Sequence, residues 1–293
     1  MEDNENLNLE KDEEILENKI KYDYNTIVLS GASTKGIVLL GGLQYAYDNC
    51  FLKNVTNYIG TSAGSIICYL LAIGYTPVEI IVYICTNQLF EKIQNFNIIA
   101  MINGSGALSF NHIHEQLEKM TIEKIGFLPN LEQLYSRFGK KLTCVTHNFT
   151  TNTTEYLNYE TFPTLPCITA LRMSSNLPLI FDRYKYGDNF YIDGGVSNNF
   201  PIDKVDIEGN KVFGLTIDFI NKNKDENFSM VEYIYNLMFI PICESVKLKV
   251  QKCSSRCDIF KLNSDVNIFN FNINSKKKLD MFSSGYQQLK NYV

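Results

Sequence analysis

The apolar residues of the chain fall into two alternating patterns. Compact runs rich in β-branched residues predict strands, which cover residues 26–30, 55–59, 141–150, 153–158, 190–192, 211–219, 259–262 and 266–273. Segments with helical spacing of apolar residues follow most of them, at 37–47, 65–73, 77–85, 110–120, 131–135, 167–175, 228–252 and 277–292. Asn130 is suited to cap the helix at 131–135, and residues 196–201 are expected to form an extended loop. Strands that alternate with helices indicate an α/β layered domain.

Residues 65–85 are apolar enough to look like a membrane span, but the run is interrupted after Gly74. There Thr76 is suited to cap a new helix, Pro77 to its first position, and Glu79 to complete a capping box. Each half is too short to cross a bilayer. The pattern therefore predicts two buried helices.

Composition and charge narrow the class of protein. The chain has 293 residues, 45% of them hydrophobic, a net charge of −5 and no strongly basic segment, which argues against a nucleic-acid partner. Eight cysteines, at positions 50, 68, 85, 144, 167, 243, 253 and 257, are scattered and form no C-x-x-C pair. No signal peptide is recognisable, so we expect reduced thiols and a cytoplasmic protein.

The division of the chain follows the same patterns. Residues 1–24 are acidic and predict a mobile leader, within which 13–20 has the pattern of a short helix. Residues 25–293 are expected to form the folded domain, with its motifs in 26–201 and further strands and helices in 211–293.

A serine lies between the second predicted strand and the helix that follows. Gly60-Thr61-Ser62-Ala63-Gly64 matches the G-x-S-x-G pattern at a strand–turn–helix corner, where it holds the serine in a strained, exposed position. The following helix also directs N–H groups and a positive dipole end toward that position. The alternative is a glycine- and serine-rich turn without chemistry.

The loop after the first strand is a second candidate. It consists of Gly31, Ala32, Ser33, Thr34, Lys35 and Gly36. It lacks the spacing of a phosphate-binding P-loop, and Ser33 breaks the dinucleotide fingerprint G-x-G-x-x-G. An oxyanion-binding turn that serves the serine is the better interpretation, and an ordinary strand–helix loop is the alternative.

The base for such a serine is not an obvious histidine. The three histidines are His112, His114 and His147. In an α/β-hydrolase the catalytic histidine lies late in the chain, after the acid, and this chain has no histidine after position 147. His112 and His114 point to different faces of a helix, so they are poor metal partners. We expect no metal and no cofactor, and activity that survives a chelator.

Three motifs together resemble the patatin-like phospholipases. These are Ser30-Gly31 to Lys35-Gly36 as the oxyanion loop, the Gly60–Gly64 elbow, and Asp193-Gly194-Gly195. The likeness runs from Thr26 to Pro201 and includes the segment Ala170–Pro178. It implies a three-layer α/β/α domain with a central, mostly parallel sheet.

The resemblance also implies a serine–aspartate dyad. Ser62 would be the nucleophile and Asp193 its base, whereas nearby Asp182 and Asp188 lack the motif. Gly31, Ala32 and Ser33 would supply the oxyanion N–H groups. The family has glycine where this chain has Ala32 and Ser33, so a side chain there is strained if the backbone needs a positive φ.

The implied function is lipid acyl hydrolysis of the phospholipase A type by a serine carboxylic-ester hydrolase. The substrate would be a phospholipid or another acyl lipid, reached by peripheral contact with a membrane, with or without an activating protein partner. The alternative is a non-catalytic lipid-binding or host-interaction module on the same scaffold. A free aspartate has a pKa of about 3.9 and a histidine a pKa of about 6.5. With Asp193 as the base, we therefore expect no obligatory loss of activity centred at the pKa of histidine.

Overall fold

The computed structural model describes residues 23–87, 108–218, 230–266 and 273–293. The expected leader lies outside the described residues except for positions 23 and 24, as do the predicted helix at 13–20 and most of the predicted strand at 266–273. Tyr24, which we assigned to the leader, is fully buried and packs edge-on against Phe51 and Phe213. The folded part therefore already includes Tyr24.

Eight strands form one sheet in the described part of the chain, in the order β5-β6-β3-β2-β1-β7-β8, with β4 paired to β3. The strands are β1 (Thr26–Leu29), β2 (Asn57–Thr61), β3 (Lys141–Asn148), β4 (Thr153–Leu157), β5 (Tyr184–Tyr186), β6 (Asn189–Asp193), β7 (Val212–Ile217) and β8 (Cys257–Leu262). The pairs from β3 through β2, β1 and β7 to β8 are parallel, and the pairs of β4, β5 and β6 are antiparallel. The sheet is thus mostly parallel, as expected.

Helices follow the strands along the chain. They are α2 (Gly36–Asp48), α3 (Ala63–Ala72), α4 (Pro77–Thr86), α6 (Asn111–Ile125), α7 (Leu131–Phe138), α8 (Cys167–Ser174), α9 (Gly195–Asn198), α10 (Met230–Lys252) and α11 (Ser275–Tyr292), with 3-10 turns η1 (Ser33–Lys35) and η3 (Pro201–Lys204). The predicted capping box of α4 is present, since Thr76 and Glu79 exchange hydrogen bonds. Asn130 caps α7, as predicted.

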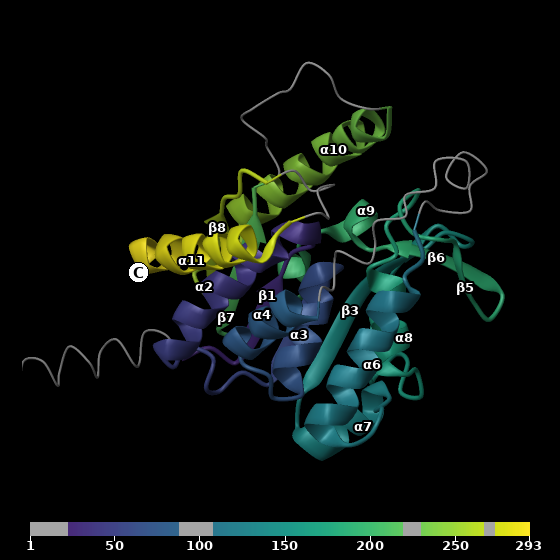
Figure 1. The fold of residues 1–293 in the computed structure, drawn as a ribbon, viewed down its shortest axis with the longest axis horizontal. Coiled ribbons are helices and arrows are strands. Elements are labelled where there is room, and N and C mark those ends of the chain that lie inside the picture. Colours follow the sequence, from purple (N-terminus) through teal and green to yellow (C-terminus); the bar gives the residue numbers. More distant parts are fainter. Residues whose placement is uncertain (1–22, 88–107, 219–229, 267–272) are drawn as a thin grey trace, which may run out of the picture.

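The sheet is covered on both faces. Successive side chains of a strand point to opposite faces, so Ile27 and Leu29 join a large core with α2, α3, α4 and α11, while Val28 joins a smaller core. In the smaller core Val28 packs with Ile202 of η3 and Val246 of α10. In Figure 1, α10 runs along the upper edge of the molecule, next to α9. The three-layer α/β/α arrangement is the predicted one.

The helices from the membrane-like segment are packed into this domain. α3 and α4 bury most of their apolar side chains in the large core. Among the described residues no single helix has the length and apolar character needed to cross a membrane, and α3 and α4 meet that test only as a pair bent by 118°.

Two predictions of local structure were wrong. We expected an extended loop at 196–201, but residues 195–198 form α9 and 201–204 form η3. The Gly194 carbonyl accepts the N–H groups of Ser197 and Asn198, and so short a turn has no periodic apolar signal. Strand β5 was also not predicted, because it is three residues long and largely exposed.

Candidate active site

Ser62 lies at the sharp corner between β2 and α3. Its backbone is in the unusual region φ 54°, ψ −127°, a conformation that is costly for a residue with a side chain. The two glycines of the motif make this corner possible by close approach. A Cβ atom at Gly60 would lie 2.4 Å from the backbone of Gly64, and one at Gly64 would lie 2.5 Å from the carbonyl oxygen of Ser30. Thr61 and Ala63 complete the elbow, and the Thr61 hydroxyl donates to the Asn198 carbonyl oxygen at 2.9 Å.

A second serine holds the elbow in place. The backbone N–H of Ser62 donates to the hydroxyl oxygen of Ser174 at 2.9 Å, and the Ser174 hydroxyl donates to the Val145 carbonyl oxygen at 2.6 Å. Ser174 ends α8 and is fully buried. We quoted this segment in the resemblance but assigned no role to Ser174, since a buried serine at a helix end gives no sign of what it contacts.

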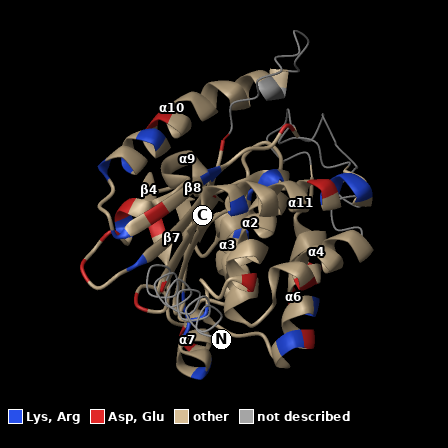
Figure 2. Cartoon of the chain, turned by 90° about the vertical axis from the view of Figure 1, so that its left-hand side faces the viewer, with Lys and Arg blue, Asp and Glu red and all other residues tan. Residues whose placement is uncertain are grey.

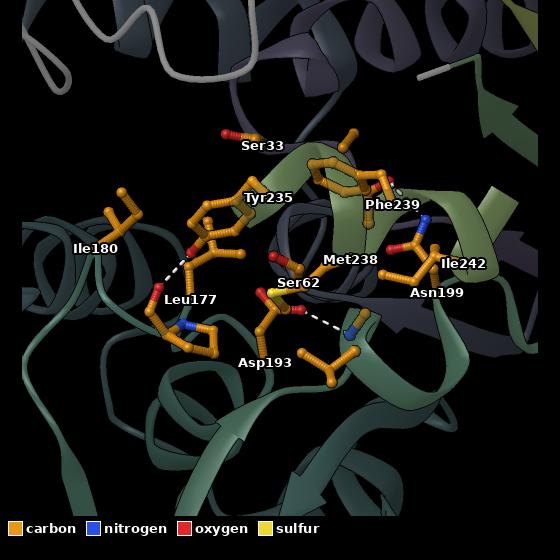
Figure 3. Close-up of a pocket in the computed structure, with 15 residues that line it drawn as sticks. Ser33, Ser62, Leu177, Ile180, Asp193, Asn199, Tyr235, Met238, Phe239 and Ile242 are labelled. Atoms are coloured by element: carbon orange, nitrogen blue, oxygen red, sulfur yellow. Dashed lines mark hydrogen bonds between the residues drawn. The ribbon is translucent and has the colours of Figure 1, made fainter. Parts of the chain in front are cut away.

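Asp193 comes to Ser62 from the end of β6. Its Oδ1 accepts the N–H of Gly195 at 2.7 Å, and its own N–H donates to the Asn176 carbonyl oxygen at 2.9 Å. Gly194 donates in turn to the Ser174 carbonyl oxygen at 3.2 Å. Figure 3 shows the Ser62 and Asp193 side chains next to each other, although 130 positions separate them in the chain. The structure thus brings together the two residues that the resemblance paired.

The other carboxylate oxygen of Asp193, Oδ2, is buried and has no partner of ordinary hydrogen-bond geometry within the described residues. The Ser62 hydroxyl is nevertheless close enough to affect the carboxyl. Catalytic hydrogen bonds are often long or poorly aligned before a substrate is bound and tighten afterwards. Of the two carboxylate oxygens, Oδ2 is therefore the one that keeps a position open for a further hydrogen bond, as far as the structure describes its surroundings.

Burial dominates the acidity of this group. It raises the pKa of Asp193 from 3.8 to about 6, because removal from water disfavours the charged form. The nearby Ser62 hydroxyl and the hydrogen bond from the Gly195 N–H oppose this, because both stabilise the charged carboxylate. The sequence left open whether the pKa of Asp193 would be raised or lowered. In the structure burial raises this pKa, close to the range where a histidine titrates.

No histidine lines the pockets around Ser62, as far as the structure describes their walls. His112 and His114 lie on α6, where His114 pairs with Glu118, and His147 on β3 contacts Asn152. Asp182 is likewise engaged elsewhere, because its carboxylate accepts the Arg172 guanidinium at 2.9 Å.

The loop from Gly31 to Gly36 lies against the elbow. A Cβ atom at Gly31 would lie 3.4 Å from Cβ of Ser62 and 2.3 Å from Oδ1 of Asn199. Asn199 also binds the loop, since its side-chain amide donates to the Gly31 carbonyl oxygen and its backbone carbonyl accepts the Gly31 N–H at 3.0 Å. The Gly31 N–H, which we expected to donate to an oxyanion, is therefore already engaged in this structure, and its oxyanion role stays a prediction. We did not single out Asn199 from the sequence.

The remaining loop residues have distinct roles. Ala32 has φ −150°, and Ser33 has φ 48°, so of the two positions only Ser33 is left-handed. The N–H groups of Ala32 and of Ala63, the residue after Ser62, have no hydrogen-bond partner in the described part of the chain. Thr34 and Lys35 form η1 and are buried, and Gly36 begins α2. The backbone N–H groups of Ala32 and Ala63 thus remain available to a bound group beside Ser62.

Two apolar pockets meet at Ser62, and both also contain Ser33 and Leu177. The first, the α10 pocket, is closed by side chains of α10 (Tyr235, Met238, Phe239 and Ile242; Figure 3). The second, the α6 pocket, extends between α3, α4 and α6, with walls that include Ile66, Leu70, Ile80, Ile113, Leu117 and Met120. The sequence predicted these helices but not which side chains face the serine.

One group outside the site has the composition of a metal site. Carboxylate and thiol atoms of Asp206, Cys253 and Cys257 lie within 4.8 Å of one another. The Asp206 carboxylate already accepts hydrogen bonds from Ser254 and Arg256. None of the three residues lines the described walls of the pockets around Ser62.

Comparisons with known proteins identify the family of the chain. Residues 27–206 match the patatin-like phospholipase family. The "Probable lipid hydrolase 463L" of invertebrate iridescent virus 6 is 37% identical over 191 residues, which cover 63% of this chain and 64% of the viral protein, less than two thirds of its length. The "Uncharacterized protein R571" of Acanthamoeba polyphaga mimivirus is 27% identical, with 95% of each chain covered.

The fold also matches a solved structure. VipD from Legionella pneumophila superposes with a TM-score of 0.54 and 16% identity, covering 92% of this chain and 66% of VipD. The match of residues 27–206 includes the oxyanion loop, the Ser62 elbow and Asp193. The chain therefore belongs to the patatin-like phospholipase family.

Proposed function

We propose that the chain is a lipid acyl hydrolase of the phospholipase A type, with Ser62 as nucleophile and Asp193 as base. One observation carries the proposal: a serine held at a strained corner lies beside a buried carboxylate, at the junction of two apolar pockets. Family membership supports the same reaction class.

The reaction follows from the groups in place. Ser62 Oγ attacks the ester carbonyl carbon while its proton passes to Oδ2 of Asp193, and the resulting oxyanion accepts the N–H groups of Ala32 and Ala63. The alcohol leaves with the proton from Asp193, and an acyl-enzyme remains. Water then attacks the acyl carbon, gives its proton to Asp193, and the fatty acid departs as Ser62 recovers its hydrogen. These steps need no metal or organic cofactor.

The raised pKa of Asp193 suits this role. A carboxylate with a pKa of about 6 accepts a proton more readily than a free aspartate, and it remains mostly ionised at neutral pH. The unpartnered Oδ2 atom supports the same assignment.

The pockets favour an acyl lipid as substrate. The α6 pocket is almost entirely apolar, and Ser62 is part of its wall, so it is suited to a fatty-acyl chain. The α10 pocket lies on the other side of Ser62 and would take the leaving group. We also propose that the enzyme acts in the cytoplasm, peripheral to membranes during turnover.

A fluorophosphonate probe and Ser62→Ala test the proposal. The probe should label the parent chain covalently, and labelling and ester turnover should both vanish in Ser62→Ala with an unchanged thermal unfolding curve. Ser65→Ala is the matched control, because Ser65 is a buried serine three residues away whose hydroxyl donates to the Ser62 carbonyl oxygen. Turnover that persists in Ser62→Ala would refute the nucleophile.

The second candidate is a lipid-binding module without turnover. Ser33 supports it, because a serine at positive φ in the oxyanion loop and an engaged Gly31 N–H leave fewer donors for the transition state. A folded parent chain that binds fatty acid but is not labelled by the probe would favour this function.

A further inference from the structure

Helix α10 has two apolar faces, and the described residues of the chain bury only one of them. Its inner face closes the α10 pocket above Ser62. Its outer face, which we define as Met230, Tyr233, Ile234, Leu237 and Ile240, is exposed. The first four follow the spacing i, i+3, i+4, i+7, and Ile240 continues it at i+10, so the five form one stripe along the N-terminal half of the helix. Met230 is 73% exposed and Ile240 62%.

The helix is held with this orientation at both ends. The Tyr235 hydroxyl donates to the Pro178 carbonyl oxygen, next to the site. Near the other end, the Lys249 ammonium group donates to the Asn198 side chain at 2.6 Å and pairs with Asp203 at 2.7 Å. The outer face therefore points away from the domain because both ends of α10 are tied to it.

Charge is distributed unevenly along α10. The N-terminal half, residues 230–240, contains one charged residue in the sequence, Glu232, whereas charged residues become frequent toward the C-terminus, as Figure 2 shows for the described positions. They include exposed Lys247 and Lys252, together with Glu244, which pairs with Lys247 at 3.6 Å. An apolar stripe that continues into lysines is typical of helices that lie in the interface of a membrane.

We propose that the outer face of α10 docks the enzyme on a lipid bilayer, with its apolar side chains inserted below the headgroups. This inference rests on the proposed lipid hydrolase function for its choice of a lipid partner. The same helix forms the wall of the α10 pocket, so docking here places the bilayer beside the pocket where the ester must reach Ser62. A lipid can then pass from the bilayer to the site along an apolar path.

The size of the outer face favours a bilayer over a protein. A stable protein–protein interface uses about 20–30 residues a side, whereas this face offers five apolar side chains on one helix. Insertion into a bilayer needs only a short apolar stripe, because the lipid surrounds each side chain.

The first test measures flotation of the full chain with vesicles of phosphatidylcholine containing a minor share of phosphatidylserine. All variants carry Ser62→Ala, so binding is measured without turnover. Leu237→Asp with Ile240→Asp should weaken binding about tenfold or more, because two apolar side chains no longer leave water. The matched control is Val82→Asp with Ile122→Asp, two helical positions that are 52% and 51% exposed on α4 and α6. The control should bind as its parent does.

The second test does not depend on disruptive variants. The chain contains no tryptophan, so Leu237→Trp introduces a unique probe on the outer face. Its fluorescence should shift to the blue with vesicles and be quenched by brominated lipid, whereas Ile122→Trp should change in neither respect.

Several results would overturn the inference. In flotation, these are a parent chain that does not float with vesicles, or an equal loss of vesicle binding in the test and control pairs. In fluorescence, it is a Leu237→Trp emission that does not change with lipid. In ultracentrifugation, it is a dimer that Leu237→Asp with Ile240→Asp dissociates. The last would make the outer face an interface between copies. Failure of the proposed function would appear instead as turnover that survives Ser62→Ala, with vesicle binding intact.

Discussion

The backbone N–H of Ser62 donates to the hydroxyl of Ser174, 112 positions away, at 2.9 Å. The same hydroxyl donates to the Val145 carbonyl oxygen of β3, so one serine ties the nucleophile to the neighbouring strand. The strained corner at Ser62 therefore depends on a residue that is not a member of the dyad.

We expect Ser174→Ala to lower kcat about tenfold with little change in KM, because Ser62 is no longer held at its angle to the ester. Stability should fall by about 1–3 kcal/mol, since a buried N–H loses its partner. The control is Ser175→Ala. The Ser175 hydroxyl is buried without a partner among the described residues, so its removal should leave stability equal or higher. Equal losses in both variants would contradict the positioning role.

Asp193 should weaken the fold in which it acts. Burial raises its pKa to about 6 in the folded chain, above about 3.9 in the unfolded chain. The folded state then binds the proton more tightly, so this group lowers stability as pH rises between these values, and the loss is complete above about 6. A displacement of this size corresponds to about 3 kcal/mol.

Asp193→Asn should therefore be inactive and more stable than the parent at pH 7, by about 1–3 kcal/mol, because the amide carries no charge. At pH 4 the parent carboxyl is protonated and the difference should vanish. Denaturant unfolding at the two pH values measures this. A variant that is less stable than the parent at pH 7 would show that the carboxylate is not penalised by burial.

Activity should fall as the pH drops through about 6, when Asp193 becomes protonated and can no longer accept the proton of Ser62. This revises the expectation that no loss would be centred near the titration range of histidine. The pH profile alone no longer separates the two residue types. Replacing His112, His114 and His147 together by glutamine should leave the acid limb in place. A limb that disappears in that variant would assign it to a histidine.

The two departures from the family's glycine loop should respond in opposite ways. Ser33 has positive φ, so Ser33→Gly relieves strain and should raise stability by up to about 1 kcal/mol, partly offset by the freer unfolded chain. Ala32 is outside the left-handed region, so Ala32→Gly should lower stability by about 0.5–1 kcal/mol.

Kinetics test whether the loop acts on the transition state. Glycine at Ser33 or Ala32 should change kcat more than KM, because the loop holds donors for charge that develops only during reaction. Equal changes in kcat and KM, or no change in either, would argue against an oxyanion role.

The α6 pocket predicts selectivity for acyl length. Leu70 lies two helical turns, about 10 Å, beyond Ala63 and forms part of the pocket wall. Leu70→Phe should shorten the pocket, so that kcat/KM for a palmitoyl ester falls about tenfold while that for a butyryl ester stays the same. Comparison of butyryl, octanoyl and palmitoyl esters measures this. Parallel losses for all three would show that the acyl chain lies elsewhere.

Local chemistry determined much of this protein in the sequence itself. Residue patterns of period two and 3.6 placed the strands and helices, and Thr76, Pro77 and Glu79 marked a helix start, because such signals act between neighbours in the chain. The glycines on either side of Ser62 likewise predicted a sharp corner. Only glycine fits at positions 60 and 64, because a Cβ atom there would clash with neighbouring backbone atoms.

Tertiary structure alone decided what surrounds that corner. The Ser174 side chain binds the backbone N–H of Ser62, and the Asn199 side chain binds the backbone carbonyl of Gly31. Tyr235 and Phe239 close the α10 pocket from a helix far along the chain. The pKa of Asp193 also belongs to this class, because burial is the sum of many distant neighbours and leaves no pattern in the sequence. The sequence motifs identify the candidate reacting groups, Ser62 and Asp193. Packing determines the orientation of these side chains, the pKa of Asp193 and the pocket walls that a lipid would contact.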